Sequence, residues 1–98
     1  METKTNNMKT VAKVVEVEGE GLVALLDKQV LIICNNYFYY GKLVGVNDTC
    51  IKLETPYKVF ETGAYTDKKF ADAQRLPVDF WYIQTGHIES FGESFKSV

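Results

Sequence analysis

The sequence predicts a mainly β fold, a small and strongly bent antiparallel barrel. Residues 30–34 are an apolar run, and residues 37–46 are a long run of aromatic and β-branched residues that Gly41 and Gly45 interrupt. Glycines inside a strand usually mark a bend. An asparagine pair separates the two runs and is typical of a turn. A strand, a tight turn and a bent strand in this order form the corner of a barrel.

The length and charge of the chain set limits on its class. With 98 residues the chain fits one domain, and a domain this small buries about 60–65% of its unfolded surface. The net charge is −2 and the pI is about 5.3, so the overall basic excess of a general nucleic-acid coat is missing. Any binding of anions is therefore expected to be local.

Cysteine use and hydropathy favour a cytoplasmic protein without cofactors. Cys34 and Cys50 lack the spacing of a metal site and follow no secretory signal, so both are expected to be free thiols. The longest uncharged stretch, residues 29–41, contains two asparagines and is shorter than the ~20 apolar residues that span a bilayer. Neither a metal nor a membrane partner is predicted.

The N-terminal part of the chain predicts three elements. Residues 1–9 are polar and have no period, which indicates a flexible tail. Residues 10–18 mix β-branched residues with alternating charges and predict a short extra strand, with a helical turn as the alternative. Leu22, Leu25 and Leu26 then recur at helical spacing and predict a short amphipathic helix.

The rest of the chain predicts three further strands. After a turn, residues 51–53 resume an alternating pattern and begin the third strand. Residues 55–79 are too long for a simple hairpin and predict an elaborated insertion, with a short helix over residues 66–76. The fourth and fifth strands are predicted at residues 80–83 and 88–91. We thus expect one domain over residues 10–91, followed by a polar tail at residues 92–98.

Two segments resemble the two motifs of the Sm and Sm-like family, which includes the bacterial RNA chaperone Hfq. The residues at the positions of the first motif are Tyr39, Gly41, Leu43, Val46 and Asn47. Residues 81–91 look like the second motif, a strand, a tight polar turn and a final strand. The chain is also similar to small Sm-like proteins of bacteriophages. The resemblance implies a strongly bent, five-stranded antiparallel open barrel with a short N-terminal helix.

The resemblance also implies a function. In Sm-like rings, the loop after the bent strand and the turn of the second motif meet at the central pore and bind single-stranded RNA. The corresponding residues here are Asn47, Asp48, Thr49, Gln84, Thr85, Gly86 and His87. Three of them depart from the family pattern, because Asn47 replaces an Asp, Thr49 replaces a stacking aromatic residue and Gln84 replaces an Arg. Simple roles in turns, packing or surface solvation remain the alternative for all seven.

A homo-oligomeric ring would also cover apolar surface. The aromatic residues at 37–40 and 80–82 alternate across their strands and place rings on both faces of the sheet. In the family, the fourth strand of one subunit pairs with the fifth of the next. The implied interface residues are Phe80, Trp81, Tyr82, Ile88 and Phe91. The alternative is a monomer or dimer with partly exposed tyrosines.

Two functions are consistent with the sequence, and neither is catalytic. The first is a ring that binds uridine- or adenosine-rich single-stranded RNA at its loops. The second is a structural or adaptor ring that binds a protein partner through residues 55–79, which the acidic pI and the altered loops favour. An enzyme is not predicted, because the single histidine, His87, lacks plain partners for catalysis.

Overall fold

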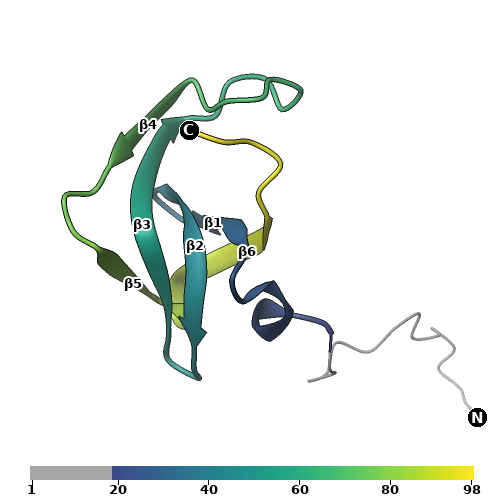
Figure 1. Cartoon of the computed structure of the whole chain (residues 1–98), viewed down its shortest axis with the longest axis vertical. Coiled ribbons are helices and arrows are strands. Elements are labelled where there is room, and N and C mark those ends of the chain that lie inside the picture. Colours follow the sequence, from purple (N-terminus) through teal and green to yellow (C-terminus); the bar gives the residue numbers. More distant parts are fainter. Residues whose placement is uncertain (1–18) are drawn as a thin grey trace, which may run out of the picture.

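The structure is a computed structural model, and it describes residues 19–98. The predicted tail at residues 1–9 and the predicted extra strand at residues 10–18 lie outside the described residues. A single sheet of six strands contains most of the described chain, in the order β4-β3-β2-β1-β6 with β5 also paired to β3 (Figure 1). The elements are η1 (Leu22–Leu25), β1 (Gln29–Cys34), β2 (Phe38–Val46), β3 (Cys50–Glu61), β4 (Asp72–Arg75), β5 (Phe80–Gln84), η2 (Thr85–His87) and β6 (Ile88–Glu93).

The bends predicted from the glycines lie in β2. The pairing of β2 with β3 shifts register beside Gly41 and again beside Gly45. A Cβ atom at Gly41 would lie 3.1 Å from the main-chain oxygen of Glu54, so the two strands approach too closely there for a side chain. Opposite this bulge, Thr55 adopts a positive φ of 53°. Both strands therefore bend sharply at the same level of the sheet.

One long strand carries two short ones. β4 pairs with the C-terminal half of β3, and β5 pairs with its N-terminal half. Both short strands are antiparallel to β3, and residues 76–79 separate one from the other. The predicted fourth strand, at residues 80–83, is β5, and β4 lies in the predicted insertion, which raises the number of strands from the predicted five to six.

The short helix predicted over residues 66–76 is wrong. Phe70, Ala73 and Leu76 have helical spacing, yet residues Asp72–Arg75 are extended and pair with β3. A helix of this length is marginal in isolation. The long edge of β3 offers hydrogen-bond partners to the extended chain, and those bonds replace the helical ones.

The N-terminal helix and the sheet agree with the Sm-like architecture that the sequence predicted. The helix is a single 3-10 turn, η1, which packs Leu22 and Leu25 against the core. The sheet is strongly bent and unclosed. Within residues 19–98, β5 pairs only with β3 and β6 only with β1, so each leaves one backbone edge open.

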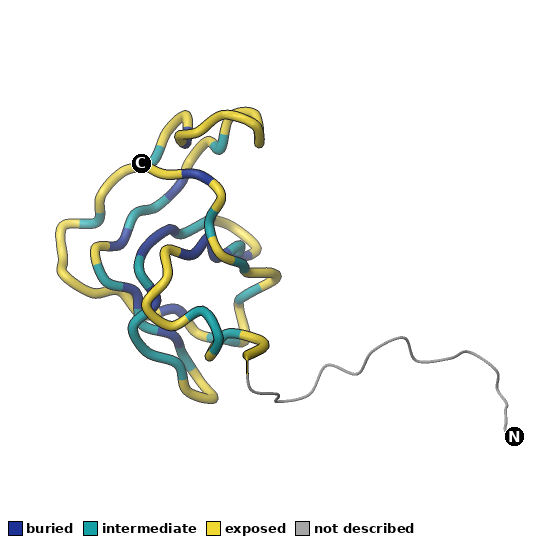
Figure 2. The backbone as a smooth tube through the Cα atoms, turned by 45° about the vertical axis from the view of Figure 1, so that its right-hand side comes forward, coloured by how far each residue is buried: buried dark blue, intermediate teal, exposed yellow. Residues whose placement is uncertain are grey.

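The two faces of the sheet carry separate cores. Most buried residues lie along the strands, and the turns between the strands are exposed (Figure 2). The inner core, on the concave face, consists of Val30, Ile32, Cys34, Leu43, Ile51, Leu53 and Ile83. The outer core, on the opposite face, consists of Leu31, Tyr40, Val59 and Phe70. Strands alternate their side chains between faces, and the bulge beside Gly41 changes the alternation. The same strands therefore supply both cores.

The outer core is closed by the insertion and the C-terminal residues. Phe70 comes from the loop between β3 and β4, and its ring lies 5.4 Å from that of Tyr40. Residues after β6 cross this loop, where the Phe70 amide donates to the Ser97 carbonyl at 3.0 Å. The buried Lys96 side chain donates to the carbonyl of Ala64. Residues 92–98, predicted as a polar tail, thus hold the insertion against the sheet.

Candidate functional site

The loop between β2 and β3 is built around the side chain of Asn47. Its Oδ1 accepts hydrogen bonds from the amides of Thr49 and Cys50, at 2.8 and 2.9 Å, and from the Thr49 hydroxyl at 3.1 Å. An Asn or Asp side chain that bonds to the backbone two or three residues ahead fixes a turn. Asn47 therefore shapes this loop through its side-chain oxygen, which accepts all three of these hydrogen bonds.

The turn after β5 is clipped to this first loop. The Thr85 amide donates to the carbonyl of Thr49 at 2.9 Å, and the Thr85 hydroxyl donates to the carbonyl of Asp48 at 2.8 Å. Because the amide and the hydroxyl of Thr85 both donate to the first loop, Thr85 holds the two loops together. The two predicted loops therefore meet within one subunit.

The clipped loops enclose one side of a shallow hollow, which we call the loop hollow. Its volume is about 630 Å³, and it is lined by Asp48, Thr49, Cys50, Tyr82, Gln84, Thr85 and Gly86. Five of the seven predicted site residues are among these. Asn47 is not among the lining residues. The groups available to a ligand are the Gln84 amide, hydroxyls and backbone atoms, which donate and accept hydrogen bonds, together with the Cys50 thiol and the Asp48 carboxylate.

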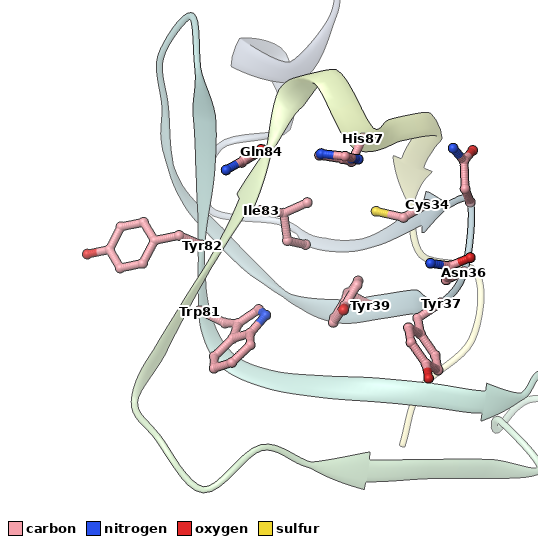
Figure 3. Close-up of a pocket in the computed structure, with 10 residues that line it drawn as sticks. Cys34, Asn36, Tyr37, Tyr39, Trp81, Tyr82, Ile83, Gln84 and His87 are labelled. Carbon is pink, nitrogen blue, oxygen red and sulfur yellow. The ribbon is translucent and has the colours of Figure 1, made fainter.

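His87 faces a second hollow instead. This hollow has a volume of about 470 Å³ and opens on the concave side of the sheet, between β5 and the turn that joins β1 to β2 (Figure 3). Its lining residues are Cys34, Asn35, Asn36, Tyr37, Tyr39, Trp81, Tyr82, Ile83, Gln84 and His87. Gln84 borders both hollows, whereas His87 borders only this one. The structure therefore separates His87 from the predicted loop residues.

The second hollow contains groups that stay protonated at neutral pH. Burial raises the pKa of the Cys34 thiol. Burial also raises the pKa of Tyr39, and negative charge on Cys34 or Tyr37 would raise it further. A raised pKa leaves a thiol in its unreactive form. Within residues 19–98, no group of three or more His, Cys, Asp and Glu side chains is placed to hold a metal ion.

The predicted interface residues lie along the two open edges. On β5, Phe80 and Trp81 are about 40% and 39% exposed, and Tyr82 is 58% exposed. On β6, Phe91 is exposed and Ile88 is half-buried. The aromatic residues of β2 depend less on a neighbouring subunit than the sequence predicts, because Phe70 of the same chain covers Tyr40.

One basic residue beside these edges was missed in the sequence. The ammonium of Lys52 lies 4.1 Å from the centre of the Phe80 ring and 5.8 Å from that of Tyr82. Lys52 is directly opposite Tyr82 in the pairing of β3 with β5. The alternation of residues 51–53 places Lys52 on the outer face, but its aromatic neighbours follow only from the strand register.

Comparison with solved structures identifies the fold. The Sm protein of Pyrococcus abyssii, solved in complex with a uridine heptamer, superposes with a TM-score of 0.53 at 18% identity. The match covers 72% of this chain and 89% of that one. The chain has the Sm-like fold. Neither the protein-family models nor the curated proteins contain a match.

The segments that resemble the two Sm motifs come together in this sheet. β1, β2 and β3 form the bent centre of the sheet, β5 pairs with β3, and β6 pairs with β1. The loop hollow lies where the two segments that resemble the Sm motifs meet. Within residues 19–98, no helix is long and apolar enough to cross a membrane.

Proposed function

We propose that this chain is the subunit of a non-catalytic, cytoplasmic homo-oligomeric ring that binds single-stranded RNA. The observation that carries the proposal is the pair of clipped loops, which join the two motif segments around one hollow on an Sm-like sheet. A protein with the same fold was solved with a uridine heptamer, which supports RNA as the ligand class. At 18% identity, the similarity between the two chains supports the fold alone, and the support for the site comes from the residues of this chain.

The loop hollow suits recognition of base edges. Gln84 is exposed and borders the hollow, and its amide offers donors and acceptors to a base. Asn47 does not line the hollow and keeps its oxygen in the turn, so its part in binding is to hold the loop in shape. Sequence-specific RNA recognition uses such bonds to unstacked bases.

The two open edges support assembly into a ring. An unpaired strand edge presents free N–H and C=O groups to another chain. β5 and β6 are different strands, so their pairing between copies is head-to-tail and closes into a ring if the rotation permits. Trp81 on β5 and Phe91 on β6 would lose exposed apolar surface in that contact.

RNA binding is tested by fluorescence anisotropy with labelled short oligouridine and oligoadenosine. Asn47→Ala removes the oxygen that holds the loop in shape, and Gln84→Ala removes the amide that borders the hollow. Both are expected to weaken binding about tenfold or more, as for the loss of a hydrogen bond to a charged or buried partner. Asn36→Ala makes the same chemical change as Asn47→Ala outside the loop hollow and is the matched control.

Two outcomes contradict this proposal. If the wild-type protein binds neither oligonucleotide, the RNA function is wrong. If it binds but Asn47→Ala and Gln84→Ala bind as tightly as Asn36→Ala, the loop hollow is not the site. Native mass spectrometry of the same samples reports whether a ring forms and whether nucleotide mass copurifies with it.

A second candidate function is a ring that acts as an adaptor for a protein partner. It is favoured by an exposed aromatic pair where the insertion meets the C-terminal residues. The rings of Tyr65 and Phe95 are 5.8 Å apart, and the side chains are 67% and 60% exposed. Tyr65→Ser with Phe95→Ser should abolish capture of that partner and leave RNA affinity unchanged. Retained capture by the double variant would exclude this surface.

A further inference from the structure

The outer face of β5 carries two exposed aromatic rings in line with the loop hollow. Phe80, Tyr82 and Gln84 alternate with Trp81 and the buried Ile83, so the first three side chains share the outer face. Figure 3 shows the Tyr82 ring on the opposite side of β5 from Ile83 and Trp81. Tyr82 and Gln84 both line the loop hollow. The row Phe80, Tyr82 and Gln84 therefore leads out of the hollow along the strand.

A lysine from the neighbouring strand accompanies this row. Lys52 lies on the outer face of β3, and its ammonium is 4.1 Å from the Phe80 ring and 5.8 Å from the Tyr82 ring. Glu54 is paired directly with Phe80 on one side and with Lys42 on the other. Lys52 is thus the cation beside the rings, and its long flexible stem lets the ammonium move to a nearby phosphate.

Phe80, Tyr82 and Lys52 supply exposed aromatic rings and a positive charge, two properties that the loop residues lack. The loops have Thr49 in place of a stacking aromatic residue and Gln84 in place of an arginine. Tyr82 borders the same hollow with a ring that is 58% exposed, and Lys52 lies beside that ring. Single-stranded RNA is bound by rings that stack on bases together with cations that contact phosphates.

We propose that Tyr82, Phe80 and Lys52 form an extension of the RNA site, on which bases leaving the loop hollow stack along the outer face of β5. This rests on the proposed function. Side chains two residues apart on a strand are about 7 Å apart, roughly two base-stacking steps, so each ring can receive its own base. Lys52 contacts the phosphate that joins these bases.

The extension is compatible with the ring. Strand pairing between subunits uses backbone groups in the plane of the sheet, whereas these three side chains project from its face. Trp81 projects to the concave side and is the β5 aromatic residue that fits the subunit contact. The three aromatic residues of β5 that were predicted as interface therefore divide, with Trp81 facing the neighbouring subunit and Phe80 and Tyr82 facing the ligand.

The test compares conservative variants by anisotropy with labelled oligouridine and oligoadenosine. Tyr82→Leu and Phe80→Leu keep apolar bulk but remove the flat ring, and each is expected to weaken binding about 5- to 150-fold. Tyr65→Leu removes an exposed ring outside this face and should bind like the wild type. Lys52→Gln should reduce the slope of log affinity against log salt by about 0.7, the effect of one phosphate contact on a single strand.

The outcomes separate this inference from the proposed function. If the wild type binds and Gln84→Ala weakens binding, while Tyr82→Leu and Phe80→Leu bind like Tyr65→Leu, then the loop hollow is right and the extension is wrong. If native mass spectrometry shows that Tyr82→Leu or Phe80→Leu changes the number of subunits, the rings belong to the subunit contact and the extension is also wrong. Absence of RNA binding by the wild type overturns both.

Discussion

The inner and outer cores of this small domain differ in how they are built. The inner core is made by strands of the sheet itself, and Ile32, Leu43, Ile51 and Leu53 are fully buried there. The outer core has fewer buried residues and is completed by Phe70, which comes from a loop that the C-terminal residues hold in place. Bending alone creates the first core, whereas the second needs extra chain.

This difference explains the place of the insertion in the fold. A sheet this bent buries its concave face and leaves its convex face open, and open apolar area on that face favours association. Phe70 covers Tyr40 and Val59 on the convex face. The outer core therefore makes that part of the sheet independent of a partner, while the edges at β5 and β6 still lack one.

The largest effect is expected in the inner core. Leu43→Ala removes a fully buried side chain that strands on all sides enclose, and it should lower the free energy of unfolding by about 4 kcal/mol. For a domain of marginal stability this is a large share of the total. Urea denaturation of Leu43→Ala measures it, with the neighbouring, half-buried Val44→Ala as the control. Equal losses in the two variants would mean that the inner core is not the main source of stability.

A smaller and more local effect is expected in the outer core. Phe70→Ala should cost about 3 kcal/mol, toward the lower end for a buried phenylalanine, because the loop can relax around the space. The insertion should then detach before the sheet unfolds. Limited trypsin digestion measures this as faster cleavage after Lys68 and Lys69. Lys69 forms a β-bridge with Ser97, and the Lys68 carbonyl accepts a hydrogen bond from the Ser97 amide. Unchanged cleavage would show that Phe70 does not anchor the insertion.

The bend that separates the two cores gives the third prediction. In Gly41→Ala the new Cβ would lie 3.1 Å from the Glu54 oxygen and 3.4 Å from the Pro56 Cα, which are backbone atoms that cannot move alone. The loss should be about 2 kcal/mol. At Gly45 the neighbours are atoms of the Lys52 side chain at 3.3 and 3.8 Å, so Gly45→Ala should cost less. Thermal unfolding of both variants tests this order, which a larger loss for Gly45→Ala would reverse.

The sequence predicts the strands that build the inner core well, because these strands depend on local patterns. The glycines of β2 indicate a bend, the asparagine pair indicates a turn, and the alternation in β3 indicates which residues share a face. Each of these patterns can be recognised without knowing the partner strand. The Sm-like fold is confirmed on these grounds. The loops of the candidate site could be predicted in the same way, because each follows directly from a strand end.

The outer core and the cation beside the rings depend on contacts between distant segments. Phe70 has helical spacing with Ala73, and only the open edge of β3 makes that segment extended. Lys52 and Phe80 are brought together by the register of β3 with β5, which is regular from Cys50 to Glu54. His87 was grouped with the loop residues by its position in the second Sm-like motif, but η2 turns it toward the other hollow. Periodicity cannot report such placements.

The smallest effect expected is the response of the two cores to alkaline pH. Burial raises the pKa of Cys34 in the inner core above its ordinary 9.0. Burial, and then negative charge on Tyr57, raise the pKa of Tyr40 in the outer core above its ordinary 10.0. Both folded forms favour the protonated group, so the stabilisation is complete below the ordinary pKa and is lost as the pH rises through the folded one.

The thermal midpoint should therefore fall in two steps, first from about pH 9 as Cys34 ionises and then from about pH 10 as Tyr40 does. Cys34→Ser cannot ionise in this range and should remove the first step, while Tyr40→Phe should make the second step smaller and leave the part due to Tyr39, whose pKa is also raised. Each variant serves as the control for the other. If Tyr40→Phe loses as much of its midpoint above about pH 10 as the wild type does, ionisation of Tyr40 is not what opens the outer core.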